Sequence, residues 1–137
     1  MNQNNIFVDT NVLIGNFANI QNDKQALKYL YELKGKCLFT STLAIAQLVS
    51  VFQKTKPNEE IKTIVKKIQA KFDLLSFVES DITKAIEIST TDIEDNIQYI
   101  IGLKKKCFYF VTNNTKDYRD FADIIVLPPE EIRAIPR

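Results

Sequence analysis

Short apolar segments alternate with amphipathic segments along nearly the whole sequence. The β-prone segments are residues 6–8, 37–40, 74–78, 107–112 and 123–127, and helical periodicity marks 12–17, 24–34, 43–52, 57–71, 81–89 and 93–105. Parallel strands need long crossover connections, which are usually helices, and such sheets carry helices on both faces. We therefore expect an α/β fold, a three-layer α/β/α sandwich around a mostly parallel sheet of four or five strands. The length, 137 residues, predicts a single domain over residues 1–137.

Composition narrows the chemistry that the chain can perform. Histidine is absent, which excludes zinc sites built on histidine and catalysis by Ser-His-Asp or Cys-His arrangements. Cys37 and Cys107 have no CxxC spacing, and we expect both to be small buried residues. With three glycines, the chain has no glycine-rich phosphate loop. Carboxylates, lysines, hydroxyls or a bound metal must therefore carry any reaction.

Targeting features point to the cytoplasm. No apolar stretch approaches the ~20 residues that a membrane-spanning helix needs. The first residues, Met-Asn-Gln-Asn-Asn, lack the charged and apolar regions of a signal peptide. We expect a cytoplasmic protein without a membrane partner. A net charge of +1 gives no bulk indication of a nucleic-acid partner either.

Acids and amides follow the predicted strands at the points where those strands end. They are Asp9 after the first strand, Gln47 in the helix after the second, Asp92 and Asp95 at the start of the helix 93–105, and Asn114 and Asp117 after the strand 107–112. Ligands of open α/β sheets bind beyond the carboxyl ends of the strands. Oxygen donors without histidine or cysteine suit Mg²⁺ and Mn²⁺, and carboxylates grouped without a cation repel one another. The pattern predicts a divalent-metal site.

Each acid also has a purely structural interpretation. Asp9 and Asp92 stand where helix N-caps are expected, with Thr91 as the alternative cap to Asp92. Asp95 falls in the first turn, where a negative charge opposes the helix dipole. Asp117 suits a turn or a cap. Taken singly, these residues do not distinguish a metal site from capping.

The combined pattern resembles the PIN-domain family of nucleases. The segment 7–14, Phe-Val-Asp-Thr-Asn-Val-Leu-Ile, is similar to the opening motif of that family, and segments 92–99, 108–118 and 127–130 resemble its C-terminal half. By this resemblance, Asp9, Asp95 and Asp117 are metal ligands and catalytic residues. Asn11 and Asn114 are supporting groups, and Thr112 is a hydroxyl near the site. The family spacing favours Asp95 over Asp92, which leaves Asp92 as a cap.

One position departs from the family pattern. Gln47 stands where the family usually has a glutamate. An amide oxygen can still ligate a cation but brings no charge. Two hypotheses therefore stay open: a metal-dependent endoribonuclease, and a degenerate domain that binds RNA or protein without cleavage. Two rival classes fit the sequence less well. Haloacid dehalogenase phosphatases usually have a second Asp where Asn11 stands. The paired acids of response-regulator receivers are not evident in this sequence.

The resemblance implies a substrate, a cofactor and partners. It implies an endoribonuclease that uses Mg²⁺ or Mn²⁺ and a metal-activated water. Many small bacterial members are VapC-like toxins, which a partner antitoxin neutralises and which often pair as homodimers. Lys116, beside Asp117, and Lys54 and Lys56, in a lysine-rich region, are the candidate RNA contacts. A solvated helix face is the alternative interpretation of those lysines.

Overall fold

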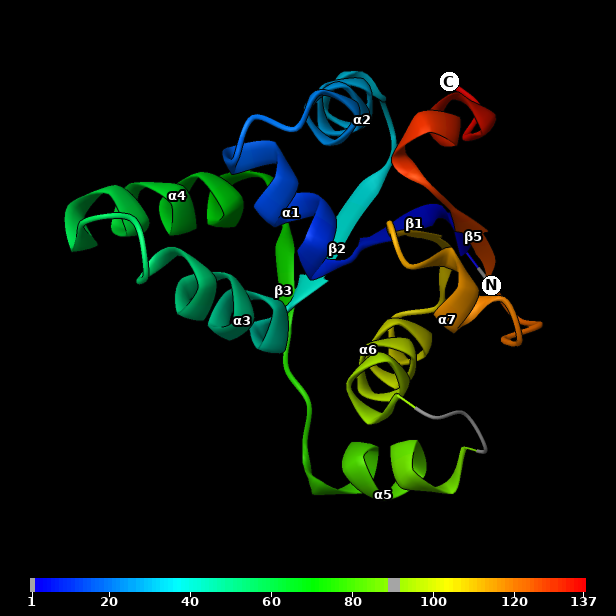
Figure 1. Cartoon of the computed structure of the whole chain (residues 1–137). Coiled ribbons are helices and arrows are strands. Elements are labelled where there is room, and N and C mark those ends of the chain that lie inside the picture. The colour runs from blue at the N-terminus through cyan, green and yellow to red at the C-terminus, as the bar shows by residue number, and fades with distance from the viewer. Residues whose placement is uncertain (1, 89–91) are drawn as a thin grey trace.

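A five-stranded sheet runs through the middle of the computed structural model, which describes residues 2–88 and 92–137 (Figure 1). Its strands are β1 (Asn2–Val8), β2 (Cys37–Ser41), β3 (Asp73–Leu75), β4 (Cys107–Val111) and β5 (Ile125–Leu127), in the order β3-β2-β1-β4-β5. All four neighbouring pairs are parallel. The predicted α/β class and the parallel sheet are confirmed, with five strands in the described part of the chain.

Helices cover both faces of the sheet. One face packs against α1 (Thr10–Phe17), α2 (Gln21–Glu32), α3 (Thr42–Phe52), α4 (Asn58–Lys71) and the 3₁₀ helix η1 (Pro129–Ala134). The other face packs against α6 (Ile93–Lys104) and the short α7 (Thr115–Tyr118). The remaining helix, α5 (Glu79–Glu87), lies against α6 on the side away from the sheet (Figure 1).

The central strand β1 shows why two layers of helices are needed. Consecutive side chains of a strand point to opposite faces. Ile6 and Val8 join the apolar core beneath α1 to α4, whereas Phe7 joins the core beneath α6 and α7. There the Phe7 ring stacks on Phe110 of β4 with 4.9 Å between ring centroids. Since β1 is apolar on both faces, each face must be covered, as is usual for parallel sheets.

Several predicted boundaries move. The third strand ends at Leu75 rather than at 78, because it is an edge strand whose partner β2 ends at Ser41, opposite Leu75. The last strand begins at Ile125 rather than at 123. Helix α5 covers Glu79–Glu87 rather than 81–89. Ser89 and the alternative cap Thr91 lie outside the described residues.

The prediction that both cysteines are buried is half wrong. Cys107 is buried, but Cys37 is exposed. Cys37 is the first residue of β2, and this strand becomes buried only from Phe39 onward. Among the described residues, every helix is too short or too polar to cross a membrane.

Candidate metal centre

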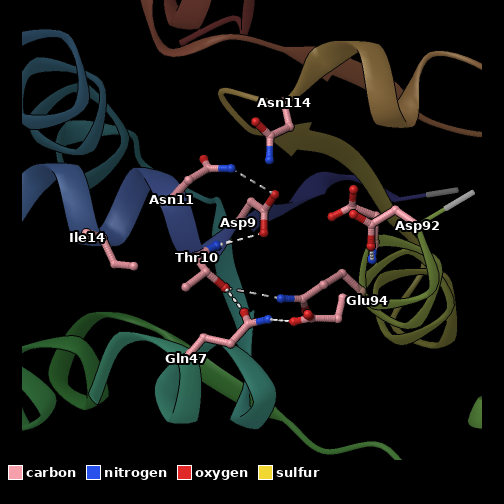
Figure 2. Close-up of a pocket in the computed structure, with 10 residues that line it drawn as sticks. Asp9, Thr10, Asn11, Ile14, Gln47, Asp92, Glu94 and Asn114 are labelled. Atoms are coloured by element: carbon pink, nitrogen blue, oxygen red, sulfur yellow. Dashed lines mark hydrogen bonds between the residues drawn. The ribbon is translucent and has the colours of Figure 1, made fainter. Parts of the chain in front are cut away.

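A polar pocket of about 310 Å³ lies at the carboxyl ends of β1 and β2, between α1, α3 and α6 (Figure 2). Because these strands are parallel, the residues that follow them share one edge of the sheet. Ten of the described residues line the pocket: Asp9, Thr10, Asn11, Ile14, Gln47, Asp92, Glu94, Asp95, Gln98 and Asn114. Residues far apart in the sequence therefore meet at one place.

Asp9 is held rigidly at the end of β1. Its side chain caps α1, since Oδ1 accepts a hydrogen bond from the Thr10 N–H at 2.8 Å. Its other oxygen, Oδ2, accepts from Thr112 Oγ1 at 2.8 Å and from Asn11 Nδ2 at 3.3 Å. Burial raises the pKa of Asp9, and these hydrogen bonds oppose that rise. Asp9 is a helix cap, as one interpretation predicted, and it also lines the pocket.

Two further carboxylates, those of Asp92 and Asp117, lie beside Asp95. One oxygen each of Asp92, Asp95 and Asp117 lies within 4.8 Å of the other two. Asp92 also caps α6 by accepting from the Asp95 N–H at 3.1 Å. Its capping role is thus observed, and its carboxylate also lies close to the other acids. Asp117, on α7, is exposed and lies next to the pocket rather than in its lining.

Asp95 has the least favourable environment for a negative charge. Burial, and then the charges of Asp92, Asp9 and Asp117, raise its pKa to about 7. Its Oδ1 accepts from the hydroxyl of Tyr118 at 3.2 Å. Its Oδ2 is buried, and no hydrogen-bond donor among the described residues reaches it. A buried carboxylate oxygen without a donor costs free energy, so it calls for a partner beyond the described residues.

The predicted supporting residues connect the two loops that carry Asp9 and Asp117. Thr112 Oγ1 donates to Asp9 and accepts from the Asn114 N–H at 3.0 Å. Asn11 Oδ1 accepts from the Asn113 N–H at 3.0 Å, and Asn11 Nδ2 also lies 3.3 Å from Thr112 Oγ1. These contacts fix the loop after β1 to the loop after β4. Asn11 and Asn114 thus line the pocket, and Thr112 contacts Asp9.

Gln47 belongs to a set of polar contacts that sequence reasoning missed. Its Oε1 accepts from Thr10 Oγ1 at 2.6 Å, and its Nε2 donates to the carboxylate of Glu94 (Figure 2). Gln98 Nε2 donates to Thr10 Oγ1 at 3.3 Å. Glu94 and Gln98 are four residues apart on α6, a spacing that places both on one helix face. The spacing of Glu94 and Gln98 can be read from the sequence, but the prediction took Asp95 as the only site residue within this helix.

Tyr118 is a further residue that the prediction missed. Its side chain is fully buried, and its hydroxyl donates to Asp95. Burial and the neighbouring charges of Asp9 and Asp95 raise the pKa of this hydroxyl, which keeps it protonated. It directly follows Asp117 in the sequence, the one signal that pointed to it.

The three predicted RNA-contact lysines are not part of the pocket lining. Lys116 is exposed on α7 beside Asp117. Lys54 and Lys56 follow the C-terminal end of α3, and Lys56 is paired with Glu60 at 3.2 Å. Their proposed contacts with RNA stay predictions.

The donor set fits a hard divalent cation. Carboxylate and amide oxygens dominate the polar lining, and the described residues bring no sulfur or imidazole to it. The unpaired Oδ2 of Asp95 and the raised pKa values of Asp9 and Asp95 both indicate negative charge that lacks a counterion. A cation at this place would offset that repulsion.

Comparisons with known proteins agree with this architecture. The model of the PIN domain family matches residues 6–123. Ribonuclease VapC1 of Aquifex aeolicus (strain VF5) is 30% identical over 142 residues, which cover 96% of this chain and 94% of that protein.

Solved structures show the same fold at lower sequence identity. VapBC2 of Rickettsia felis, bound to a DNA fragment from its promoter, gives a TM-score of 0.72 at 15% identity, over 90% of this chain and 98% of that one. VapBC-1 of nontypeable Haemophilus influenzae gives 0.73 at 15% identity, over 91% and 98%. A toxin-antitoxin complex from Klebsiella pneumoniae gives 0.69 at 18% identity, over 90% and 97%.

Proposed function

The chain belongs to the PIN-domain family, and from this premise we propose that it is a divalent-metal-dependent endoribonuclease and the toxin of a toxin-antitoxin pair. The observation that carries the proposal is the buried Oδ2 of Asp95, which has no donor among the described residues. The Asp95 carboxylate also lies beside those of Asp92 and Asp117. The ribonuclease name of the Aquifex aeolicus relative supports RNA as the substrate.

Mg²⁺ or Mn²⁺ is the proposed cofactor. Asp9, Asp95 and Asp117 would hold it: Asp9 and Asp95 line the same pocket, and one oxygen of Asp117 lies within 4.8 Å of one of Asp95. When bound, such an ion polarises the scissile phosphate and makes a bound water acidic enough to act as the nucleophile.

The other residues of the site position these acids. Thr112 and Asn11 donate to Asp9 Oδ2, and the Thr10 N–H donates to Oδ1, so the Asp9 carboxylate has a fixed orientation. Tyr118 does the same for Asp95 through Oδ1 and leaves Oδ2 unbonded. Fixed ligands of this kind reduce the reorganisation that binding and reaction require. Asn114, in the lining, completes the polar wall on the α7 side.

A non-cleaving RNA- or protein-binding module is the second candidate. It is favoured by Gln47, an amide at the position where the family usually has a glutamate. The amide oxygen of Gln47 is already engaged by Thr10 at 2.6 Å. If the remaining acids bind a cation too weakly, the domain keeps its fold but does not cleave RNA.

The proposed partners follow from the relatives. The structural neighbours named above are toxin-antitoxin or VapBC assemblies, which supports an antitoxin as partner of this chain. We also propose that residues 1–137 form one domain, that the chain pairs as a homodimer, and that it acts in the cytoplasm. Lys116, Lys54 and Lys56 are the proposed phosphate contacts, through salt-sensitive attraction.

Cleavage of end-labelled single-stranded RNA tests the proposal. We expect fragments in the presence of Mn²⁺ and none with EDTA. Asp9→Asn should cleave at least about a hundredfold more slowly than the wild type, because the ion loses a charged ligand. Equal cleavage by the wild type and Asp9→Asn would mean a contaminating nuclease. Intact RNA that is nonetheless bound by the wild type would favour the non-cleaving module.

A further inference from the structure

The amide of Gln47 is oriented by a chain of hydrogen bonds that all point the same way. Ser41 Oγ donates to Gln98 Oε1 at 2.6 Å, and Gln98 Nε2 donates to Thr10 Oγ1. Thr10 Oγ1 in turn donates to Gln47 Oε1, and Gln47 Nε2 donates to the carboxylate of Glu94. A carboxylate only accepts, so the chain ends at Glu94.

The start of this chain is firmly fixed. Ser41 caps α3 by accepting from the Ala44 N–H at 2.9 Å, so its hydroxyl proton is free to go to Gln98. Ser41 and Gln98 are both buried. The orientation of each amide is thus set by the group before it. Gln47 must present its NH₂ group, and not its oxygen, toward Glu94.

We propose that Glu94 supplies to the cation site the carboxylate that position 47 lacks, with Gln47 as the positioning residue that holds Glu94 over the pocket. This inference rests on the proposed metal-dependent function. Glu94 lines the same pocket as Asp9 and Asp95 and is otherwise an exposed side chain, free to take many rotamers. The contact with Gln47 removes that freedom at the side of the pocket where α3 contributes no charge (Figure 2).

The charges explain why the amide and the acid belong together. A glutamate at 47 would set two carboxylates against each other, which costs free energy and raises a pKa. An amide at 47 donates a hydrogen bond instead, so that the contact between positions 47 and 94 is attractive. Asp95 also lines the pocket; the residue is nine-tenths or more buried, and its Oδ2 has no donor among the described residues. That atom is independent evidence that the site awaits a cation.

Mn²⁺ affinity, measured by isothermal titration calorimetry, tests the inference without recourse to catalysis. We expect Glu94→Gln to bind Mn²⁺ about tenfold more weakly than the wild type, a loss typical of groups around a metal site. The matched control is Glu87→Gln, which removes an exposed glutamate from α5, outside the pocket lining. That variant should bind like the wild type.

A swap of the two side chains distinguishes ligand from scaffold. In Gln47→Glu/Glu94→Gln the amide and the carboxylate exchange places, and the hydrogen bond between them is kept in reverse. We expect this double variant to recover Mn²⁺ affinity to within about threefold of the wild type, since the charge at this side of the pocket returns. Thermal denaturation of each variant in EDTA verifies that the fold is intact.

Two results would overturn the inference. One is a Glu94→Gln variant that binds Mn²⁺ as tightly as Glu87→Gln, in which case the proposed nuclease stands and Glu94 is only a surface residue. The other is a folded swap variant as weak as Glu94→Gln. A wild type that binds no Mn²⁺ at all would instead remove the cation from the proposed function, and this inference with it.

Discussion

The surroundings of Asp95 disfavour its ionised form. Burial and the charges of Asp92, Asp9 and Asp117 raise its pKa to about 7, against 3.8 for an unperturbed aspartate. An acid with a raised pKa in the folded state favours folding fully below its unfolded pKa, and that contribution is lost as the pH rises through the folded value. Without a cation, stability therefore falls as the pH rises from about 4 to about 7, and the full cost of the Asp95 charge remains above that window.

Replacement of Asp95 by Asn should remove this cost. In EDTA, we expect Asp95→Asn to have a higher melting temperature than the wild type at about pH 8, and nearly the same one at about pH 4, where the wild-type carboxyl is protonated. Differential scanning calorimetry across this pH range provides the comparison. A wild type more stable than Asp95→Asn at about pH 8 would show that Asp95 is not destabilised by its surroundings.

Thr112 is the residue whose single hydroxyl serves three groups. It donates to Asp9 and accepts from the Asn114 N–H, with the amide of Asn11 also within reach. We expect Thr112→Val to lower the free energy of unfolding by about 1–3 kcal/mol, because buried polar groups lose their partner while the volume stays nearly the same. Urea denaturation measures the loss. Thr112→Ser, which keeps the hydroxyl, should lose clearly less, and an equal loss would point to the methyl group.

At this scale the sequence located the acids better than their partners. Asp9 was predicted because it directly follows an apolar strand, and Asp95 and Asp117 were chosen by the resemblance to the family pattern. Glu94 and Gln98 were not, because their role depends on which side chain of α3 reaches α6 across the pocket. Tyr118 was not either, since a buried hydroxyl between acids cannot be told from a core aromatic by sequence pattern.

Among the elements, α6 is the one whose placement decides the site, because it carries Asp95 and Glu94. Gly102 lets it approach the sheet closely: a Cβ added there would lie 2.1 Å from the Phe110 ring of β4. The aromatic ring is held in the core by Phe7, on which it stacks. The helix therefore has little room to accept a larger side chain at this point.

Gly102→Ala should push α6 away from β4. We expect the free energy of unfolding to fall by about 1–3 kcal/mol from overpacking, and Mn²⁺ affinity to fall as well because Asp95 moves with the helix. Chemical denaturation and calorimetric titration report the two effects. In a Phe110→Leu background, which makes space, the same substitution should cost less stability. An equal cost in both backgrounds would mean that the contact with Phe110 is not the cause.

The elements themselves were largely predictable, and their exceptions have local causes. Strong alternation of apolar strands and amphipathic helices predicted the parallel sheet that is observed. Helix α7 was not predicted, because four residues are too few to show helical periodicity. The shorter β3 and the exposed Cys37 both follow from where β2 begins and ends, which depends on pairing and not on residue type.

For the whole molecule, the parallel topology is what turns scattered acids into one site. The strand order places β1 beside β4, so that residue 9 and the residues after Val111 meet although about a hundred positions separate them. The net charge of +1 gives no general attraction for RNA. Under the proposed function, affinity for RNA would come from local lysines and from a cation in the pocket.

The central claim is that Asp9, Asp95 and Asp117 act together on a single divalent cation. Crystals soaked in Mn²⁺, with diffraction recorded at the manganese absorption edge, test it most directly. We expect an anomalous difference peak bonded to carboxylate oxygens of Asp9, Asp95 and Asp117, which disappears in crystals of Asp9→Asn. A saturating soak that gives no peak there, or a peak that is bonded to neither Asp9 nor Asp95, would contradict the account.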